Sequence, residues 1–182
     1  MRTLSKLLLT IGLIMTVSDA ARAGDPENTL ILEIEHGTVV IEMFPDVAPK
    51  HVERIKELTR EGFYDGVVFH RVMEGFMAQT GDPTGTGTGG SGENIVAEFS
   101  TVPFTRGTVG MARAQNPNSG DSQFFIMFAE GSFLNGQYTV WGQVVEGMEA
   151  VDKIKTAPAG RQSGMVDDPD HIVSMKVQAD VQ

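Results

Sequence analysis

Apolar and polar side chains alternate with a period of two along much of the chain, the pattern of strands with one buried face. Residues 30–35 follow this pattern, and residues 38–44 repeat it with three apolar side chains on one face: Val39, Ile41 and Met43. Between the two runs, His36 and Gly37 fit a tight two-residue turn. The first element is therefore predicted to be a β-hairpin.

A period of three to four residues appears in two places and predicts two helices. The first is expected over residues 45–62, with Pro49 in its first turn and Gly62 at its C-terminal end. Its apolar stripe recurs at helical spacing: Ala48, Val52, Ile55 and Leu58. A short second helix, which Pro158 prevents from extending, is expected from a similar stripe: Met148, Val151 and Ile154.

Further short apolar runs, separated by polar or glycine-rich loops, predict more strands. After a strand at 67–72 and a second one carrying Met77 and Gln79, the runs fall at 95–99, 108–112, 123–128, 138–145 and 171–179. About eight short strands with two separate helices favour an antiparallel barrel or sandwich over a parallel sheet. No repeat or linker divides the chain, so a single domain is expected.

The N-terminus has the pattern of a secretory signal peptide over residues 1–23. Arg2 and Lys6 precede an apolar stretch at 7–17, and residues 21–23 (Ala-Arg-Ala) fit a cleavage site before Gly24. A membrane anchor is the alternative, but eleven helical residues reach only about 16 Å against a bilayer core of roughly 30 Å. We expect a mature domain of residues 24–182 that is exported to the periplasm and is not held in a membrane.

The composition excludes several classes of function. The formal net charge is −10, and removal of three basic and one acidic residue with the signal peptide makes it −12. Such an acidic chain is poorly suited to bind nucleic acid. The absence of cysteine excludes disulfides and thiolate metal sites, and the four histidines lack metal-ligand spacing, so no metal is expected. No long apolar face suggests a dimer, and a monomer is expected.

Two motifs that suggest chemistry lack the context that it needs. Residues 85–90 match G-x-G-x-x-G, but no helix pattern follows, so we expect a surface loop and no nucleotide cofactor. Ser91 and Ser119 are not in a G-x-S-x-G motif, which disfavours a serine hydrolase. His70 should lie on the strand face opposite Arg71, and a buried, hydrogen-bonded role is expected for it.

A cation, an apolar floor and an amide lie close together in residues 69–90: Arg71, Phe76, Met77 and Gln79. Alternate residues of a strand share a face, so Met77 and Gln79 can line one surface. A second run at 122–128 adds an amide and aromatic side chains, of which Gln123 and Phe125 can reach that surface. This set suits a binding site for an extended peptide better than a nucleophile or a metal.

Residues 69–90 (FHRVMEGFMAQTGDPTGTGTGG) and 122–128 (SQFFIMF) resemble the cyclophilin family of peptidyl-prolyl isomerases. The resemblance runs from about residue 30 to residue 177, and the signal segment and acidic charge are similar to the periplasmic bacterial branch. It implies a mainly β fold: an eight-stranded antiparallel closed β-barrel capped by two α-helices. It also implies an enzyme that accelerates rotation about X–Pro bonds in exported, proline-containing polypeptides that are unfolded or partly folded.

The same resemblance implies the residues of the site. The catalytic residue would be Arg71, and twelve residues would bind substrate: Phe76, Met77, Gln79, Met111, Ala112, Arg113, Ala114, Gln123, Phe125, Phe133, Leu134 and Tyr138. Three of these depart from the best-known eukaryotic pattern, in which Phe133 is tryptophan, Tyr138 is histidine and Arg113 is asparagine. Because phenylalanine cannot donate the tryptophan's hydrogen bond, cyclosporin binding is expected to be weak.

The implied chemistry needs no metal, cofactor or covalent intermediate. Rotation about the X–Pro bond faces a barrier of about 18–20 kcal/mol because the amide loses resonance. A guanidinium N–H of Arg71 can stabilise the proline nitrogen, whose lone pair returns in the twisted transition state. Two other functions stay open: a binding module that holds proline peptides without turnover, and a hydrolase whose nucleophile the sequence does not reveal.

Overall fold

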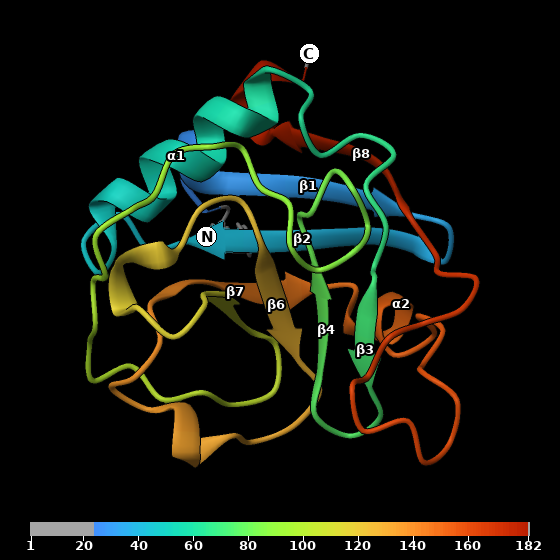
Figure 1. The fold of residues 1–182 in the computed structure, drawn as a ribbon. Helices are drawn as coiled ribbons and strands as arrows, with labels where there is room; N and C mark the ends of the chain where they lie inside the picture. The colour runs from blue at the N-terminus through green and yellow to red at the C-terminus, as the bar shows by residue number, and fades with distance from the viewer. Residues whose placement is uncertain (1–23, 182) are drawn as a thin grey trace, which may run out of the picture.

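The computed structural model describes residues 24–181, and within this range eight strands form one antiparallel sheet (Figure 1). The predicted signal peptide at 1–23 lies outside the described residues. The strands are short: β1 (Thr29–Ile34), β2 (Gly37–Met43), β3 (Arg71–Met73), β4 (Met77–Thr80), β5 (Thr108–Met111), β6 (Phe124–Met127), β7 (Val140–Glu146) and β8 (Ile172–Val177). Short 3-10 turns flank them at Pro26–Asn28, Pro117–Ser119, Ser132–Leu134 and Gln178–Asp180.

The sheet is an open, curled half-barrel, and the prediction of a closed barrel is wrong. Its strand order is β3-β4-β6-β5-β7-β2-β1-β8, which leaves β3 and β8 at the two ends. No regular ladder joins these ends within the described residues: there are two isolated bridges, Val68 to His171 and Arg71 to Met165, and scattered backbone hydrogen bonds such as that from the Phe69 amide to the Asp170 carbonyl at 2.8 Å. The chain before β8 contains Gly164 at φ 73° and Pro169, which lacks an N–H, so it cannot extend β8 as a regular ladder toward β3.

The predicted hairpin is confirmed, with its turn one residue earlier than expected. Ile34 pairs with Gly37, so Glu35 and His36 form the turn. Gly37 has a φ of 136°, which residues with a side chain rarely adopt. A glycine is therefore favoured at this first paired position after the turn. The run at 95–99 is not a strand, because only Ile95 pairs there, in one isolated bridge.

Both predicted helices are present, as α1 (Pro49–Arg60) and α2 (Met148–Val151). Helix α1 starts at Pro49 and not at residue 45, since residues 45–48 form a turn. Its N-cap residue Ala48 offers no side-chain oxygen, and the Glu98 carboxylate instead accepts hydrogen bonds from the Lys50 and His51 amides at 3.1 Å. Gly62 follows the helix at φ 72°, as predicted.

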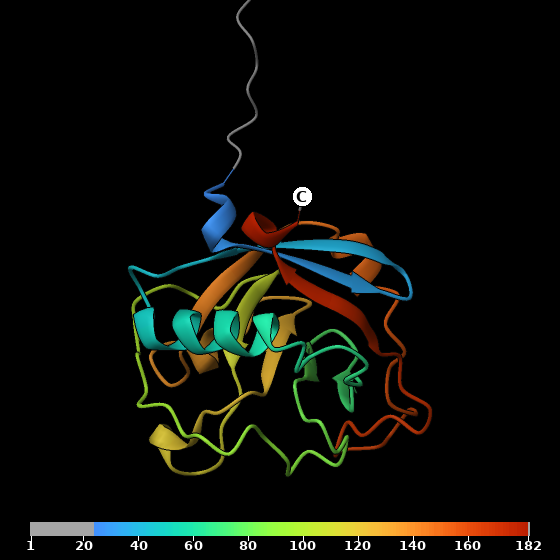
Figure 2. The same cartoon turned by 90° about the horizontal axis from the view of Figure 1, so that it is seen from above.

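The core divides into two clusters. The main core is covered by α1, which lies against one side of the curled sheet in Figure 2, and it contains the fully buried Trp141, Tyr64 and Phe124. The second cluster packs on the other face of β4 and β6: Met77, Phe104, Ala112, Phe125, Met127, Leu134 and Val140. No helix in residues 24–181 combines the length and apolar character needed to span a bilayer.

Candidate active site

Strand pairing places three predicted site residues in one row across the sheet. Arg71 of β3 faces Gln79 of β4, and Gln79 faces Phe125 of β6. Directly paired residues project from the same face, so a cation, an amide and an aromatic ring lie side by side. The next position is Gly110 of β5, where an added Cβ would lie 2.6 Å from the rings of Phe104 and Phe125. Glycine therefore leaves the space in which these two rings stack.

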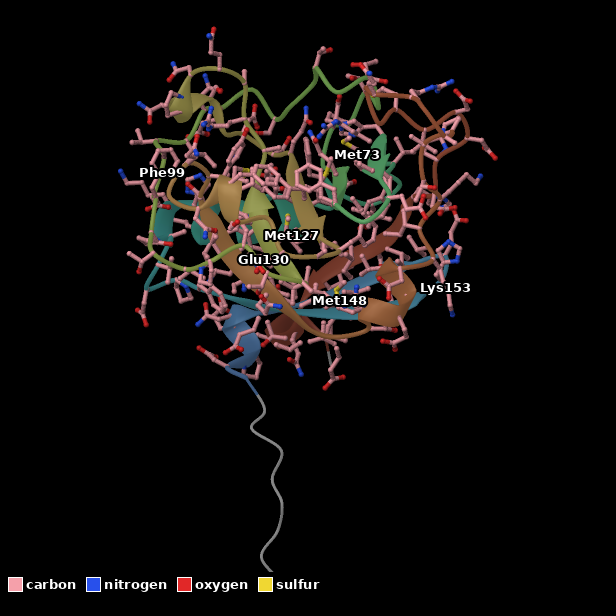
Figure 3. The ribbon with its side chains drawn as sticks, turned by 90° about the horizontal axis from the view of Figure 1, so that it is seen from below. Met73, Phe99, Met127, Glu130, Met148 and Lys153 are labelled. Atoms are coloured by element: carbon pink, nitrogen blue, oxygen red, sulfur yellow. The ribbon has the colours of Figure 1, made fainter. Side chains whose placement is uncertain are left out.

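The Arg71 side chain is half-buried and fixed by uncharged partners. Its Nη1 donates to Gln79 Oε1 at 3.1 Å, and its Nε donates to the Ser163 carbonyl at 3.0 Å. Its Nη2 lies 3.2 Å from Met73 Sδ, a weak acceptor that Figure 3 shows beside β3 and β4. No carboxylate within residues 24–181 forms an ion pair with this guanidinium. Burial lowers the pKa of Arg71, but an arginine stays protonated at neutral pH.

A chain of amide hydrogen bonds connects Arg71 to the glycine-rich loop. After Gln79 accepts from Arg71, its Nε2 donates to Gln123 Oε1 at 2.9 Å. The Gln123 Nε2 then donates to the carbonyls of Gly89 at 2.8 Å and Gly87 at 3.2 Å. This order of donors fixes which way each amide faces. Gln79 and Gln123 thus hold the guanidinium in position against a distant loop.

The glycine-rich loop is itself organised by Asp82, which is 1% exposed. Its carboxylate accepts hydrogen bonds from the amides of Thr84, Gly87 and Gly89 at 2.6–3.0 Å. Burial alone would raise the pKa of Asp82, but these hydrogen bonds outweigh it and lower the pKa to about 2. The sequence pattern predicts a surface loop here but does not indicate the role of Asp82.

Beside Arg71 lies a cavity of about 270 Å³. Ten residues line it, and all ten are predicted site residues: Arg71, Phe76, Met77, Gln79, Ala112, Arg113, Phe125, Phe133, Leu134 and Tyr138. The lining is apolar except for the two arginines, an amide and a phenol, and it has no carboxylate. Phe133 is 64% exposed and rests against Phe76 with 5.4 Å between ring centroids, so it forms an aromatic rim.

The remaining three predicted residues lie elsewhere. Ala114 and Gln123 line a neighbouring cavity of about 480 Å³. Loop residues that are not among the predicted site residues also line it: Gly87, Thr88, Gly89, Gly90, Asn94, Ser119 and Asp121. Met111 is 2% exposed in the main core and lines neither cavity. Met73 and Ser163 contact Arg71 and were also missed, although Met73 shares a strand face with Arg71 by simple alternation.

Two other features of the molecule do not add to this site. A cavity of about 1020 Å³ runs along α1, where Arg54, Lys56 and Arg60 are ion-paired with glutamates. His70 is buried at 1% exposure, as expected, and burial lowers its pKa, so it is neutral. Its ring nitrogens have no hydrogen-bond partner within the described part of the chain, contrary to the expectation of a hydrogen-bonded histidine.

Comparison with known proteins assigns the family. Residues 29–177 match the family model described as cyclophilin type peptidyl-prolyl cis-trans isomerase. The chain is 55% identical over 184 residues to a probable peptidyl-prolyl cis-trans isomerase of Brucella suis, with 94% of this chain and 91% of the relative covered. A peptidyl-prolyl cis-trans isomerase of Synechococcus elongatus is 41% identical over 150 residues, covering 82% of this chain and 96% of its own. The protein therefore belongs to the cyclophilin-type peptidyl-prolyl cis-trans isomerases.

Solved structures agree with this assignment. Cyclophilin AquaCyp293 from Hirschia baltica superposes with a TM-score of 0.78 at 30% identity, covering 87% of this chain and 77% of the other. A cyclophilin type isomerase of Cryptosporidium parvum, solved in the presence of the dipeptide Ala-Pro, has a TM-score of 0.74 at 29% identity, covering 82% of this chain and 98% of the other. The expected family is confirmed, and so is the expected mainly β fold with eight antiparallel strands and two helices, although the barrel is open and not closed.

Proposed function

We propose that this isomerase holds the proline ring of a peptide in the 270 Å³ cavity while Arg71 stabilises the twisted X–Pro amide. The observation that carries the proposal is an arginine at the edge of an apolar cavity that has no acidic partner among residues 24–181. Without such a carboxylate, the guanidinium charge is available to a ligand. An apolar cavity suits the ring, and the cation suits the polar atoms of the bond that rotates.

The hydrogen-bond geometry of Arg71 leaves donors for a substrate. Arginine has five N–H groups. Two of them donate to oxygen acceptors, on Gln79 and Ser163, while Nη2 contacts only a thioether. A substrate oxygen or the proline nitrogen is a better acceptor than sulfur, so binding exchanges a weak contact for a stronger one.

The rate enhancement follows from where charge develops. In the planar amide, the nitrogen lone pair is delocalised into the carbonyl. At the twisted geometry the lone pair returns to nitrogen, which then accepts a hydrogen bond that the planar ground state does not offer. A donor already fixed by Gln79 stabilises the transition state more than the ground state, and this difference lowers the barrier. The step needs no proton transfer and no covalent bond.

The rest of the cavity lining, called the groove below, orients the peptide. Phe76, Met77, Phe125 and Leu134 give the proline ring an apolar wall. Gln79 and the main chain at Ala112 would hold the extended chain on either side. The relative solved in the presence of Ala-Pro supports a proline-containing peptide as ligand. The exposed Phe133, whose ring has no N–H to donate, supports weak cyclosporin binding.

The proposed site of action is the periplasm, on exported polypeptides that fold there. Support comes from the signal-peptide pattern of residues 1–23, with cleavage before Gly24. The mature chain is proposed to act as a monomer. Fractionation of expressing cells, followed by intact-mass measurement of the periplasmic protein, tests this proposal. We expect the mass of a chain that begins at Gly24, and uncleaved protein in the cytosol would contradict the proposal.

The catalytic proposal is tested by isomerisation of an X–Pro peptide by residues 24–182, compared with Arg71→Ala. We expect a loss of about 100-fold or more in kcat/KM, as for removal of a donor to developing charge. Arg60→Ala is the control, because this arginine pairs with Glu27 and Asp180 away from the cavity and should keep wild-type activity. Peptide binding without turnover by the wild type would favour the binding module instead.

A further inference from the structure

Arg113 is a second arginine at the cavity, and it too has no acidic partner among residues 24–181. Its donors point at main-chain carbonyls. Nε and Nη2 donate to the Gln137 carbonyl at 3.2 and 2.9 Å, and Nη1 donates to the carbonyls of Ala114 at 2.9 Å and Gln115 at 3.3 Å. Four of the five N–H groups are thereby used, and one N–H of Nη2 remains for a ligand.

The position of this guanidinium is set before any ligand arrives. Its Cζ lies 4.5 Å from the ring centroid of Tyr138, within the range of a cation–π contact. The Tyr138 ring is in turn held edge-to-face by Phe125, with centroids 5.9 Å apart. A fixed arginine binds a carboxylate with little further loss of side-chain entropy, unlike a mobile surface arginine.

Arg113 also stands where the two cavities meet. It lines both the 270 Å³ cavity beside Arg71 and the 480 Å³ cavity beside the glycine-rich loop. The first cavity has no carboxylate in its lining. The one acid of the second, Asp121, already accepts from the amides of Ser91 at 2.8 Å and Gly92 at 2.9 Å. The boundary is thus a locally positive point on a chain with a net charge of −10.

We propose that Arg113 is a carboxylate-binding subsite that makes the enzyme prefer peptides with aspartate or glutamate beside the proline. This inference rests on the proposed function, since it assumes that the proline ring occupies the cavity next to Arg113. A side chain flanking that proline then passes the boundary between the cavities. There its carboxylate meets the remaining Nη2 N–H and the uncompensated charge. For a partly exposed pair, the expected preference is about three- to fivefold in kcat/KM.

A merely structural role for Arg113 predicts something different. As a clamp, it ties residues 114–115 to Gln137, and its loss would slow turnover of every peptide by the same factor. A charge-selecting role changes the ratio between peptides. Comparing this ratio between variants also cancels the repulsion that the acidic chain as a whole exerts on the glutamate peptide, because that repulsion is nearly the same in each variant. The informative quantity is therefore the glutamate-to-glutamine ratio of kcat/KM in each variant.

The experiment uses two peptide pairs that differ only in glutamate or glutamine, placed before the proline in one pair and after it in the other. The wild-type chain, Arg113→Gln, Arg113→Lys and Arg60→Gln are compared at low salt and in 1 M NaCl. We expect the ratio for one pair to fall about three- to fivefold in Arg113→Gln and less in Arg113→Lys. Arg60→Gln removes the same charge far from the groove and should keep the wild-type ratio. In 1 M NaCl the difference between wild type and Arg113→Gln should shrink, since the Debye length is about 3 Å.

Each outcome bears on one proposal only. If the glutamate-to-glutamine ratio is the same in Arg113→Gln as in the wild type for both peptide pairs, the carboxylate subsite is overturned, even though both proteins isomerise every peptide. Failure of the wild type to isomerise any peptide would overturn the proposed function instead. If Arg113→Gln does not fold, as judged by circular dichroism, Arg113→Lys decides the question. A lysine variant whose glutamate-to-glutamine ratio equals that of the wild type and does not change with salt counts against the subsite.

Discussion

The two faces of strands β4 and β6 carry neighbouring residues with opposite roles. Ala78, Phe124 and Ile126 are fully buried in the main core. Their sequence neighbours point the other way: Met77, Gln79, Phe125 and Met127 form or border the groove. The period of two that makes these residues strands is thus also what separates the core from the site.

The chemistry of the two faces differs as much as their position. On the core face, Phe124 packs edge-to-face on Tyr64 at 5.6 Å and on Trp141 at 5.4 Å. On the groove face, an apolar floor supports a cation and a chain of amides that are only half-buried. We infer that the core face supplies stability and the groove face supplies chemistry. Substitutions on the two faces should therefore have separable effects.

The largest expected effect is that of Phe124→Ala on stability. A fully buried phenylalanine leaves a cavity, so the free energy of unfolding should fall by about 3–5 kcal/mol in urea titrations. Its neighbour on the other face has the opposite expectation: the milder Phe125→Leu should lose less than about 1.5 kcal/mol of stability, but about tenfold in kcat/KM. If Phe124→Ala were the variant with normal stability and impaired turnover, the separation of the faces would be wrong.

The next effect comes from Asp82, which holds the loop at the edge of the groove. Its folded pKa of about 2 lies below the ordinary 3.8, so its stabilisation is present above pH 3.8 and is lost as the pH falls toward 2. This difference between the folded and the ordinary pKa corresponds to about 2 kcal/mol in the free energy of unfolding. Asp82→Asn should therefore be about 2 kcal/mol less stable than wild type at pH 7, and the gap should close near pH 2.

Urea unfolding of both proteins at several pH values between 2 and 7 measures this effect. The difference between the two proteins cancels the titration of the other carboxylates. A gap that stays constant with pH would mean that the Asp82 carboxylate contributes nothing through its charge.

The smallest effect concerns Gln123, which supports Arg71 through Gln79. Gln123→Ala should lower kcat/KM about fivefold with less than about 1 kcal/mol lost in stability, since a hydrogen bond of a positioning side chain is removed. Gln143→Ala is the control, because Gln143 bonds the main chain at Arg106, outside the lining of either cavity. Equal losses in the two variants would show that the amide chain does not support the arginine.

The comparison also explains what the sequence could predict. Alternation and the two long motifs anticipated five of the ten residues that line the cavity: Arg71, Phe76, Met77, Gln79 and Phe125. The other five lie outside the strands and were predicted only from the resemblance to the cyclophilin family: Ala112, Arg113, Phe133, Leu134 and Tyr138. Hydrogen bonds between distant segments could not be predicted. The partner Ser163 and the open edge between β3 and β8 depend on how segments far apart in the chain meet, and the Asp82 contacts depend on the folded path of one glycine-rich loop. The Met111 side chain likewise points to the main core, on the other face of β5.

We infer that the fork of hydrogen-bond donors on Arg71, and not its charge alone, stabilises the twisted amide. Arg71→Lys keeps the charge and loses the fork. NMR exchange spectroscopy on an Ala-Pro peptide at saturating enzyme measures the cis–trans rate, and a titration gives Kd. We expect a rate at least tenfold below wild type, with a Kd within about threefold of the wild-type value. A wild-type rate in Arg71→Lys would contradict it.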